Sequence, residues 1–222
     1  MKTVHKTVRC YLKGSPKTPR PSHIKKNEDE VREFRESLPE KISEITYNID
    51  MKVKTFSCDE TGFGLITSLG KRITLRGVRP VGLIQRTFQN YYIYGAADVE
   101  DGENFFLEFP NMNTDCLQSF LYKFSEFFQD SMNILLIDNA GIHKAERLII
   151  PENIRLIFLP PYSPELNPVE RFWQYIKKDI KGKIFSGLME MKDCVADILK
   201  KCSDRMTASL TGFPYISDAI NG

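Results

Sequence analysis

Hydrophobic positions along this chain change their spacing from helical to extended and back again. Residues 28–45 place apolar side chains three to four positions apart behind an acidic first turn, which predicts an amphipathic helix. Its expected buried face consists of Val31, Phe34, Leu38 and Ile42. From about Tyr47 apolar residues alternate with polar ones or form short runs bounded by Gly, Asn and Asp, which predicts strands. These strands are YNIDMKVKTFSCDE, ending at Asp59, then KRITLRG, NYYIYGAADV and ENFFLEF.

The second half of the chain adds helices and two further strands. Residues 115–129 have helical spacing, and their expected buried face consists of Leu117, Phe120, Leu121, Phe124, Phe127 and Phe128. The run NILLID at 133–138 is apolar almost throughout, as in a strand that is buried on both faces. The strand IRLIFL follows, then the proline-rich LPPYSPELNP, a helix from Pro168 to about Lys183 and a helix from about Gly187 to Cys202. Together these elements predict an α/β domain with a βββαβ core.

The first 27 residues differ from the remainder in charge and composition. Helical spacing over about Thr3–Leu12 is followed by GSPKTPRPSH, whose prolines and glycine predict a linker. The net charge of +2 conceals that this segment holds eight Lys or Arg residues and no acid. Because neutralised phosphates release counterions, the segment suits DNA, with Lys13, Lys17, Arg20, Lys25 and Lys26 as the expected contacts. A merely solvated basic tail is the alternative.

Composition excludes several classes of protein. With 41% hydrophobic and 27% charged residues, the chain is expected to be globular. No run approaches the roughly 20 apolar residues that cross a bilayer, and the first residues lack the apolar stretch of a signal peptide, so we expect a cytoplasmic protein with no membrane partner. The five cysteines are odd in number and form no CxxC pair, which argues against a disulfide framework and a structural zinc.

Three carboxylates fall where predicted strands end and where a predicted helix begins. Asp59 ends the first strand, Asp138 ends the apolar strand, and Glu170 lies in the first turn after the proline loop. Such positions can converge on one crevice of a mixed sheet. Mg²⁺ prefers oxygen ligands, and two ions about 4 Å apart can activate the attacking oxygen and stabilise the leaving oxygen at phosphorus. The sequence therefore suggests a two-metal site for phosphoryl transfer, with Asp59 as the hypothetical bridging ligand.

Each acid also has a purely structural interpretation. Asp59 and Glu60 suit a turn, and Asp138 suits an Asx turn. Glu170 suits a capping box that begins at Asn167. From the residues alone, these interpretations and the metal site both stay open.

Polar residues near the three acids are candidates for contacts with DNA. On the predicted helix, Glu170 shares a polar face with Gln174, Lys177, Lys178 and Lys181, which suits a phosphate backbone and equally a solvated surface. The candidate contacts are His143, Tyr162, Arg171, Lys177 and Lys178. His143 alternatively suits a helix start or a packing role.

The segment from Ile134 to Lys178 carries two long motifs, LLIDNAGIHK and LPPYSPELNPVERFWQYIK. They resemble the catalytic domain of Tc/mariner-type DDE transposases, specifically the bacterial insertion-sequence 630 group. With CDE and RGVRP, the resemblance covers roughly Val31–Ile198. It implies an RNase H-like fold, here a mixed five-stranded sheet flanked by helices, with Mg²⁺ or Mn²⁺ as cofactor, two ions per site. Asp59, Asp138 and Glu170 match the three acids of the family.

The same resemblance implies cleavage and strand transfer at the inverted-repeat ends of an insertion sequence, usually into a TA target. The expected partners are double-stranded DNA and a second copy of the chain, at the bacterial nucleoid. Three features depart from the family: the interval of 32 positions from Asp138 to Glu170 is tight, KRITLRG lacks a Trp, and the chain begins within what resembles the last helix of a helix-turn-helix region. That region is expected to be largely missing, which makes the product of an upstream reading frame a candidate partner.

The expected organisation is a basic DNA-binding remnant and linker at 1–27, a connecting helix at 28–45, the catalytic domain at 46–205 and a tail at 206–222. Two alternatives to a transposase remain. One is an RNase H-like nuclease that hydrolyses DNA without joining it, and the other is a non-catalytic, DNA-binding or regulatory remnant.

Overall fold

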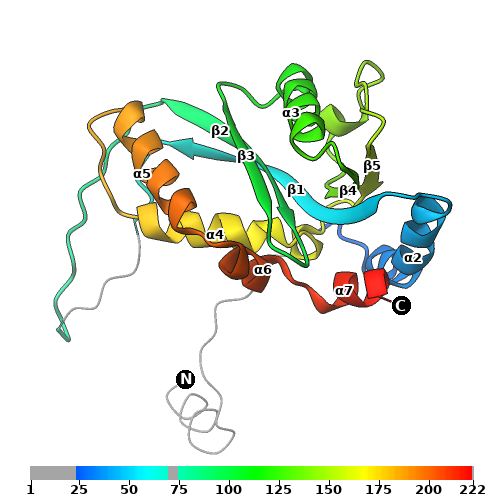
Figure 1. Ribbon diagram of the computed structural model, residues 1–222. Helices are drawn as coiled ribbons and strands as arrows, with labels where there is room; N and C mark the ends of the chain where they lie inside the picture. The colour runs from blue at the N-terminus through cyan, green and yellow to red at the C-terminus, as the bar shows by residue number, and fades with distance from the viewer. Residues whose placement is uncertain (1–23, 70–74, 222) are drawn as a thin grey trace, which may run out of the picture.

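A mixed five-stranded sheet runs through the centre of the computed structural model, which describes residues 24–69 and 75–221 (Figure 1). In chain order the helices and strands are α2 (Glu28–Thr46), β1 (Lys52–Gly64), β2 (Asn90–Asp98), β3 (Asn104–Phe109), α3 (Thr114–Phe127), β4 (Ser131–Ile137), η2 (Gly141–Lys144), β5 (Ile154–Phe158), η3 (Pro164–Leu166), α4 (Val169–Ile180), α5 (Leu188–Lys201), α6 (Asp204–Thr211) and α7 (Pro214–Asn221). The strand order is β3-β2-β1-β4-β5. Strands β1, β2 and β3 form an antiparallel meander, and β4 and β5 run parallel to β1. This is the RNase H-like arrangement, as expected.

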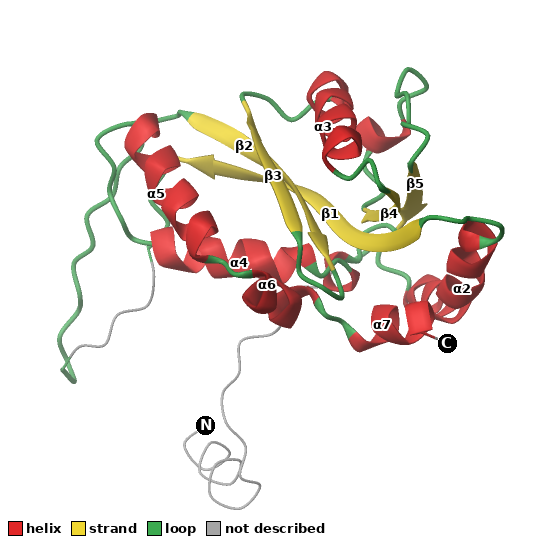
Figure 2. Ribbon diagram, viewed as in Figure 1, coloured by secondary structure: helices red, strands yellow, loops and turns green. Residues whose placement is uncertain are grey.

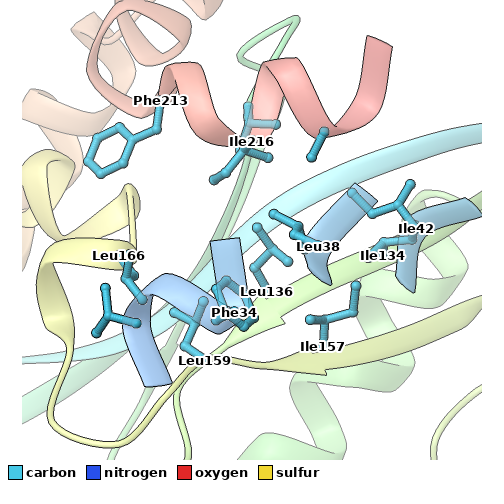
Figure 3. Close-up of a cluster of buried hydrophobic side chains, with 13 residues drawn as sticks. Phe34, Leu38, Ile42, Ile134, Leu136, Ile157, Leu159, Leu166, Phe213 and Ile216 are labelled. Atoms are coloured by element: carbon cyan, nitrogen blue, oxygen red, sulfur yellow. The ribbon is translucent and has the colours of Figure 1, made fainter. Parts of the chain in front are cut away.

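Helices cover both faces of this sheet (Figure 2). On one face, α3 packs against apolar residues of β1, β2 and β4, forming a cluster rich in Phe side chains. On the other face, α4 and α5 cover the β1–β2 part of the sheet. Helices α2 and α7 close the same face over β4 and β5 (Figure 3). Strand β4 is buried along its whole length, which explains its unbroken apolar sequence.

The first strand is longer than the sequence predicted. Asp59 does not end β1, because the strand continues to Gly64 and pairs Asp59 with Gly95 of β2. The continuation is favourable because Thr61 and Phe63 stay buried after the acid. Part of KRITLRG lies outside the described residues, and its last residues form no strand.

The helices predicted after residue 27 are present, with three corrections, and the helix expected over about Thr3–Leu12 lies outside the described residues. The buried face of α2 is the predicted one. On α3, however, Phe127 is 64% exposed, because the buried stripe runs through Leu121, Phe124 and Phe128 and leaves Phe127 at its edge. Helix α4 ends at Ile180 rather than near Lys183. The stretch expected to be a tail contains part of α6 and all of α7, whose Ile216 is buried against the core.

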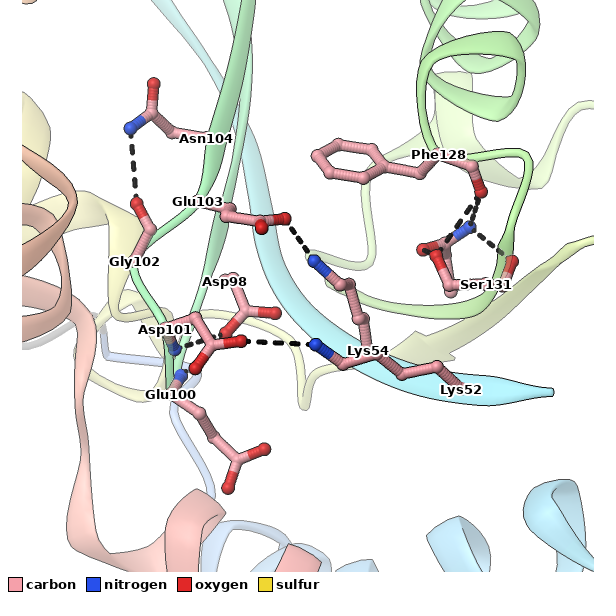
Figure 4. A network of polar contacts seen from close by, with 11 residues as sticks. Lys52, Lys54, Asp98, Glu100, Asp101, Gly102, Glu103, Asn104, Phe128 and Ser131 are labelled. Atoms are coloured by element: carbon pink, nitrogen blue, oxygen red, sulfur yellow. Dashed lines mark hydrogen bonds and ion pairs between the residues drawn. The ribbon is translucent and has the colours of Figure 1, made fainter.

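A polar network joins the beginning of β1 to the turn between β2 and β3 (Figure 4). The carboxylate of the buried Asp98 accepts the backbone N–H groups of Glu100 and Asp101, each at 2.8 Å. Lys54 forms an ion pair with Glu103. The network therefore fixes the hairpin at the end of the sheet away from Asp59.

No helix within the described residues is long and apolar enough to cross a membrane. The four cysteines that the structure describes, Cys58, Cys116, Cys194 and Cys202, are free thiols.

Candidate functional site

Asp59, Asp138 and Glu170 line one cavity of about 340 Å³. Asp59 lies on β1, Asp138 follows the last residue of β4, and Glu170 lies in the first turn of α4. Since β1 and β4 are parallel with Ser57 beside Leu136, two further residues along each strand bring Asp59 and Asp138 to the same level. The proline loop at 159–164 completes the wall. The convergence that the sequence suggested is therefore present.

The alternation of β1 separates Asp59 from its neighbour Glu60. Successive strand residues point to opposite faces of a sheet. Phe63 packs beneath α4, and Asp59, four residues before it, faces the same side. Cys58 packs in the cluster beneath α3, and Glu60 therefore points to that side, where its side chain is 4% exposed. Asp59, and not Glu60, is the cavity acid of this strand.

Burial and mutual repulsion perturb the cavity carboxyls. Burial raises the pKa of Asp59 well above its ordinary value, and the charges of Glu60, Glu170 and Asp138 raise it further. Burial also raises the pKa of Glu170, with Lys177 opposing the rise and Asp138 adding to it. Carboxylates that repel one another in a partly dehydrated cavity are stabilised by a bound cation.

Asp138 makes its hydrogen bonds to neighbouring residues through one carboxylate oxygen. Its Oδ1 accepts the backbone N–H of Ala140 at 3.0 Å, which is the predicted Asx turn, and lies 2.7 Å from Nδ1 of His143. Burial alone would raise the pKa of Asp138, but the hydrogen bond and charge of His143 outweigh burial and lower it. The side chain is 52% exposed, and no hydrogen bond to Oδ2 occurs in the described part of the chain. The turn and a metal-binding role are thus compatible.

His143 occupies a buried packing position, the alternative to a DNA contact, and its contact with DNA stays a prediction. Its side chain is fully buried and both ring nitrogens have partners. Nδ1 donates to the Asp138 carboxylate, and Nε2 donates to Glu60 at 3.0 Å. Burial alone would lower the pKa of His143, but the hydrogen bonds to Asp138 and Glu60 raise it to about 10. The ring is therefore an imidazolium that orients Asp138 from behind.

Glu170 has no capping role, because the predicted capping box is not formed. Asn167 instead accepts a hydrogen bond from the Ser57 hydroxyl and donates from Nδ2 to the Cys58 carbonyl at 3.0 Å. The Ser57 hydroxyl in turn accepts the N–H of Val169 at 2.9 Å. These buried bonds fasten the start of α4 to β1 beside Asp59. The Glu170 carboxylate makes no hydrogen bond or ion pair within the described residues, so it is available to the cavity.

Gly95 allows α4 to approach the sheet at the level of Asp59. It lies directly opposite Asp59, and a Cβ at this position would stand 2.6 Å from Cη2 of Trp173 and 2.6 Å from Cδ1 of Phe106. Trp173 is buried and lies three residues after Glu170 on α4. The sequence contained a signal for this role, since a glycine inside a strand often marks the close approach of another element. Ser57, Glu60 and Asn167 carried no comparable signal.

The donor set suits a hard divalent cation, because carboxylate oxygens are its preferred protein ligands. Within residues 24–69 and 75–221, no group of three or more His, Cys, Asp or Glu side chains already stands close enough to enclose an ion. The three acids thus line the cavity without converging fully on one point.

The structure describes only some of the DNA contacts predicted near the N-terminus. Lys13, Lys17 and Arg20 lie outside the described residues, and Lys25 stays a prediction. The contact of Lys26 with DNA also stays a prediction; its side chain is 14% exposed, and its ammonium group binds Glu28 at 2.8 Å and Glu165 at 2.5 Å. Its charge is therefore used within the protein.

The remaining candidates lie around the cavity and along α4. Tyr162 lines the cavity and has a positive φ of 57°. Arg171 is exposed and lies over the Phe213 ring at 4.1 Å. Lys177 and Lys178 are exposed on α4. Their contacts with DNA stay predictions.

Comparisons with known proteins agree with this geometry. The model of a family described as DDE superfamily endonuclease matches residues 54–192. The uncharacterized protein y4pE/y4sA of Sinorhizobium fredii is 38% identical over 96 residues, which span 42% of this chain and 71% of that protein. The Mos1 strand transfer complex has a TM-score of 0.69 at 15% identity, covering 98% of this chain and 69% of that one. The Mos1 mariner paired end complex with Mn has a TM-score of 0.70 at 15% identity, covering 99% and 68%. At such identities the structural likeness establishes the fold.

Proposed function

Because the chain belongs to the DDE superfamily of endonucleases, we propose that it is the catalytic part of a Tc/mariner-type transposase that cuts DNA and joins the cut end to a target. One observation carries the proposal: Asp59, Asp138 and Glu170, from three separate elements, line one cavity. The region matched by the family model contains all three.

These carboxylates would hold Mg²⁺ or Mn²⁺, two ions per site, with Asp59 between them. When bound, such ions would activate the attacking oxygen and stabilise the leaving oxygen at phosphorus. The protein's own contribution is to position the ligands. His143 orients Asp138 through Oδ1, and the buried bonds of Asn167 hold the helix that presents Glu170. Such positioning is required because the ligands must be placed within about 0.5 Å.

The proposed substrates are the inverted-repeat ends of a mobile element and a TA target. The similar Mos1 structures are a strand transfer complex and a paired end complex with Mn, which supports a DNA partner and a divalent cation. We further propose that a homodimer acts on paired ends at the bacterial nucleoid. The product of an upstream reading frame is a further proposed partner.

A cleavage assay tests the proposal. The purified chain is incubated with Mg²⁺ or Mn²⁺ and a plasmid carrying the element with its flanking DNA. Asp59→Asn, Asp138→Asn and Glu170→Gln should each reduce cleavage at least a thousandfold, roughly as expected for the loss of a group that acts on the transition state. The matched control, Asp130→Asn, neutralises an exposed acid outside the cavity and should cleave normally.

Each outcome distinguishes one function. Cleavage followed by joining supports a transposase, whereas nicking alone indicates a nuclease. DNA binding without any metal-dependent cleavage would indicate a regulatory remnant and contradict the proposal.

A further inference from the structure

A second hollow, of about 500 Å³, lies beside the cavity and is here called the lysine groove. One wall is the end of β1 with the residues after it, 62–68. The other wall is the second half of α4 and the turn that follows. It carries Lys177, Lys178, Lys181 and Lys183, and all four side chains belong to exposed residues.

The groove lysines are not neutralised by acids. Elsewhere in the protein, Lys52, Lys54 and Lys192 each form an ion pair with an acidic residue. Among the residues that the structure describes, Lys177 and Lys178 have no such pair, nor do Lys181 and Lys183. Although the charge of Lys177 also acts on Glu170, four lysines along one wall that form no ion pair within the described residues produce a positive potential that favours an anionic partner.

Both walls of the groove lead to the cavity. Strand β1 continues from Asp59 into Gly62 and Gly64, and α4 continues from Glu170 to the lysines. At about 1.5 Å per residue, Lys177 lies roughly 10 Å and Lys181 roughly 16 Å along the helix from Glu170. An anionic chain that leaves the cavity can therefore continue directly along the groove.

We propose that the lysine groove binds the phosphate backbone of one DNA strand next to the bond that is cut. This rests on the proposed function. Phosphates of one strand are spaced about 3.4 Å along a duplex axis, so the lysines would meet roughly the third to fifth phosphates from the cavity. The wall after β1 includes Ile66, whose apolar side chain is 54% exposed and offers a surface on which deoxyribose can rest. Lysine contacts of this kind position DNA and carry no sequence preference.

The salt dependence of DNA binding tests this inference. The full chain and the variant Lys177→Ala/Lys181→Ala are titrated with a fluorescent 30-base-pair duplex of arbitrary sequence between 50 and 200 mM salt. Losing two phosphate contacts should make the negative slope of log K against log salt shallower by about 1.8 and weaken binding roughly tenfold at 100 mM salt. The matched control, Lys123→Ala/Lys200→Ala, removes the same charge from exposed sites on α3 and α5 and should keep the full slope.

A second measurement locates the strand. Single methylphosphonates, which remove the charge of one phosphate, are placed at successive positions beside the cleavage site. In wild-type protein, a substitution three to five phosphates from the cut should weaken binding, and in the lysine variant the same substitution should have little additional effect.

Failure of the inference is distinguishable from failure of the proposed function. If the lysine variant keeps the full slope while wild-type protein cleaves, the groove proposal is wrong and the catalytic proposal stands. If wild-type protein never cleaves DNA but the salt dependence of the lysine variant is weaker as expected, the catalytic proposal is wrong and the groove proposal stands. Binding of an acidic peptide in preference to DNA would also overturn the inference.

Discussion

Replacing Gly95 with alanine should both destabilise the protein and slow its chemistry. The added Cβ would stand 2.6 Å from Cη2 of Trp173 and 2.6 Å from Cδ1 of Phe106, whereas carbon atoms pack at about 3.5–4.0 Å. The Trp173 ring must therefore retreat by roughly 1 Å. Overpacking of this kind costs about 1–3 kcal/mol of unfolding free energy. Because Glu170 lies one turn earlier on the same helix, the displacement is transmitted to the cavity, where 1 Å of misplacement costs about a hundredfold in rate.

Urea unfolding and single-turnover cleavage measure the two effects on the same preparation. The control is Gly187→Ala, whose Cβ would meet no atom within 4 Å and which lines neither the cavity nor the lysine groove; it should leave cleavage unchanged. Trp173→Phe in the Gly95→Ala background should restore part of the activity, because it removes the clash with Cη2, though not the clash with Phe106, and also removes a buried Nε1 that has no partner in the described residues. If Gly95→Ala leaves both stability and cleavage unchanged, the sheet does not set the position of α4 in this way.

Three further predictions concern the groups around the cavity. Asp59→Asn should abolish cleavage and raise the melting temperature of the metal-free protein at neutral pH, because the raised pKa of Asp59 means that its charge destabilises the fold. The gain in melting temperature should vanish in acid, where the wild-type carboxyl is protonated. Equal melting temperatures of the two proteins at pH 7 would contradict this prediction. The pKa of His143 is raised to about 10, so its stabilising contribution is complete below about pH 6.5 and is lost as the pH rises through 10. Urea unfolding of His143→Gln should therefore show a deficit that shrinks between pH 7 and 10, and a constant deficit would refute this. Asn167→Ala removes the donor to the Cys58 carbonyl and the acceptor of the Ser57 O–H, at about 1–3 kcal/mol for each orphaned group, and urea unfolding should register the loss. Asn111→Ala, at an exposed asparagine, is the control and should unfold like wild-type protein.

Local pattern was sufficient to predict most of the elements. The stripe on α2 and the unbroken apolar run of β4 each reflect burial that neighbouring residues in the sequence share, so periodicity revealed them. Asp138 could be placed for the same reason, since it directly follows β4. The end of β1 could not be placed, because only the packing of Phe63 beneath α4 shows that the strand continues beyond Asp59.

The support around the cavity depends on partners far apart in the sequence. Glu60 meets His143 across 83 positions, and Ser57 meets Asn167 across 110. Sequence spacing says nothing about such pairs, so Asn167 was interpreted as a helix cap and His143 as a DNA contact. In the structure both residues use their hydrogen bonds to hold the elements that carry the acids.

Calorimetric titration with Mn²⁺ tests the central claim, that Asp59, Asp138 and Glu170 together hold divalent metal. Wild-type protein should bind Mn²⁺ with a measurable heat that disappears in the variant Asp59→Asn/Asp138→Asn/Glu170→Gln, while that variant still unfolds cooperatively. If the triple variant binds Mn²⁺ as tightly as wild-type protein, the metal lies elsewhere and these carboxylates do not form the site.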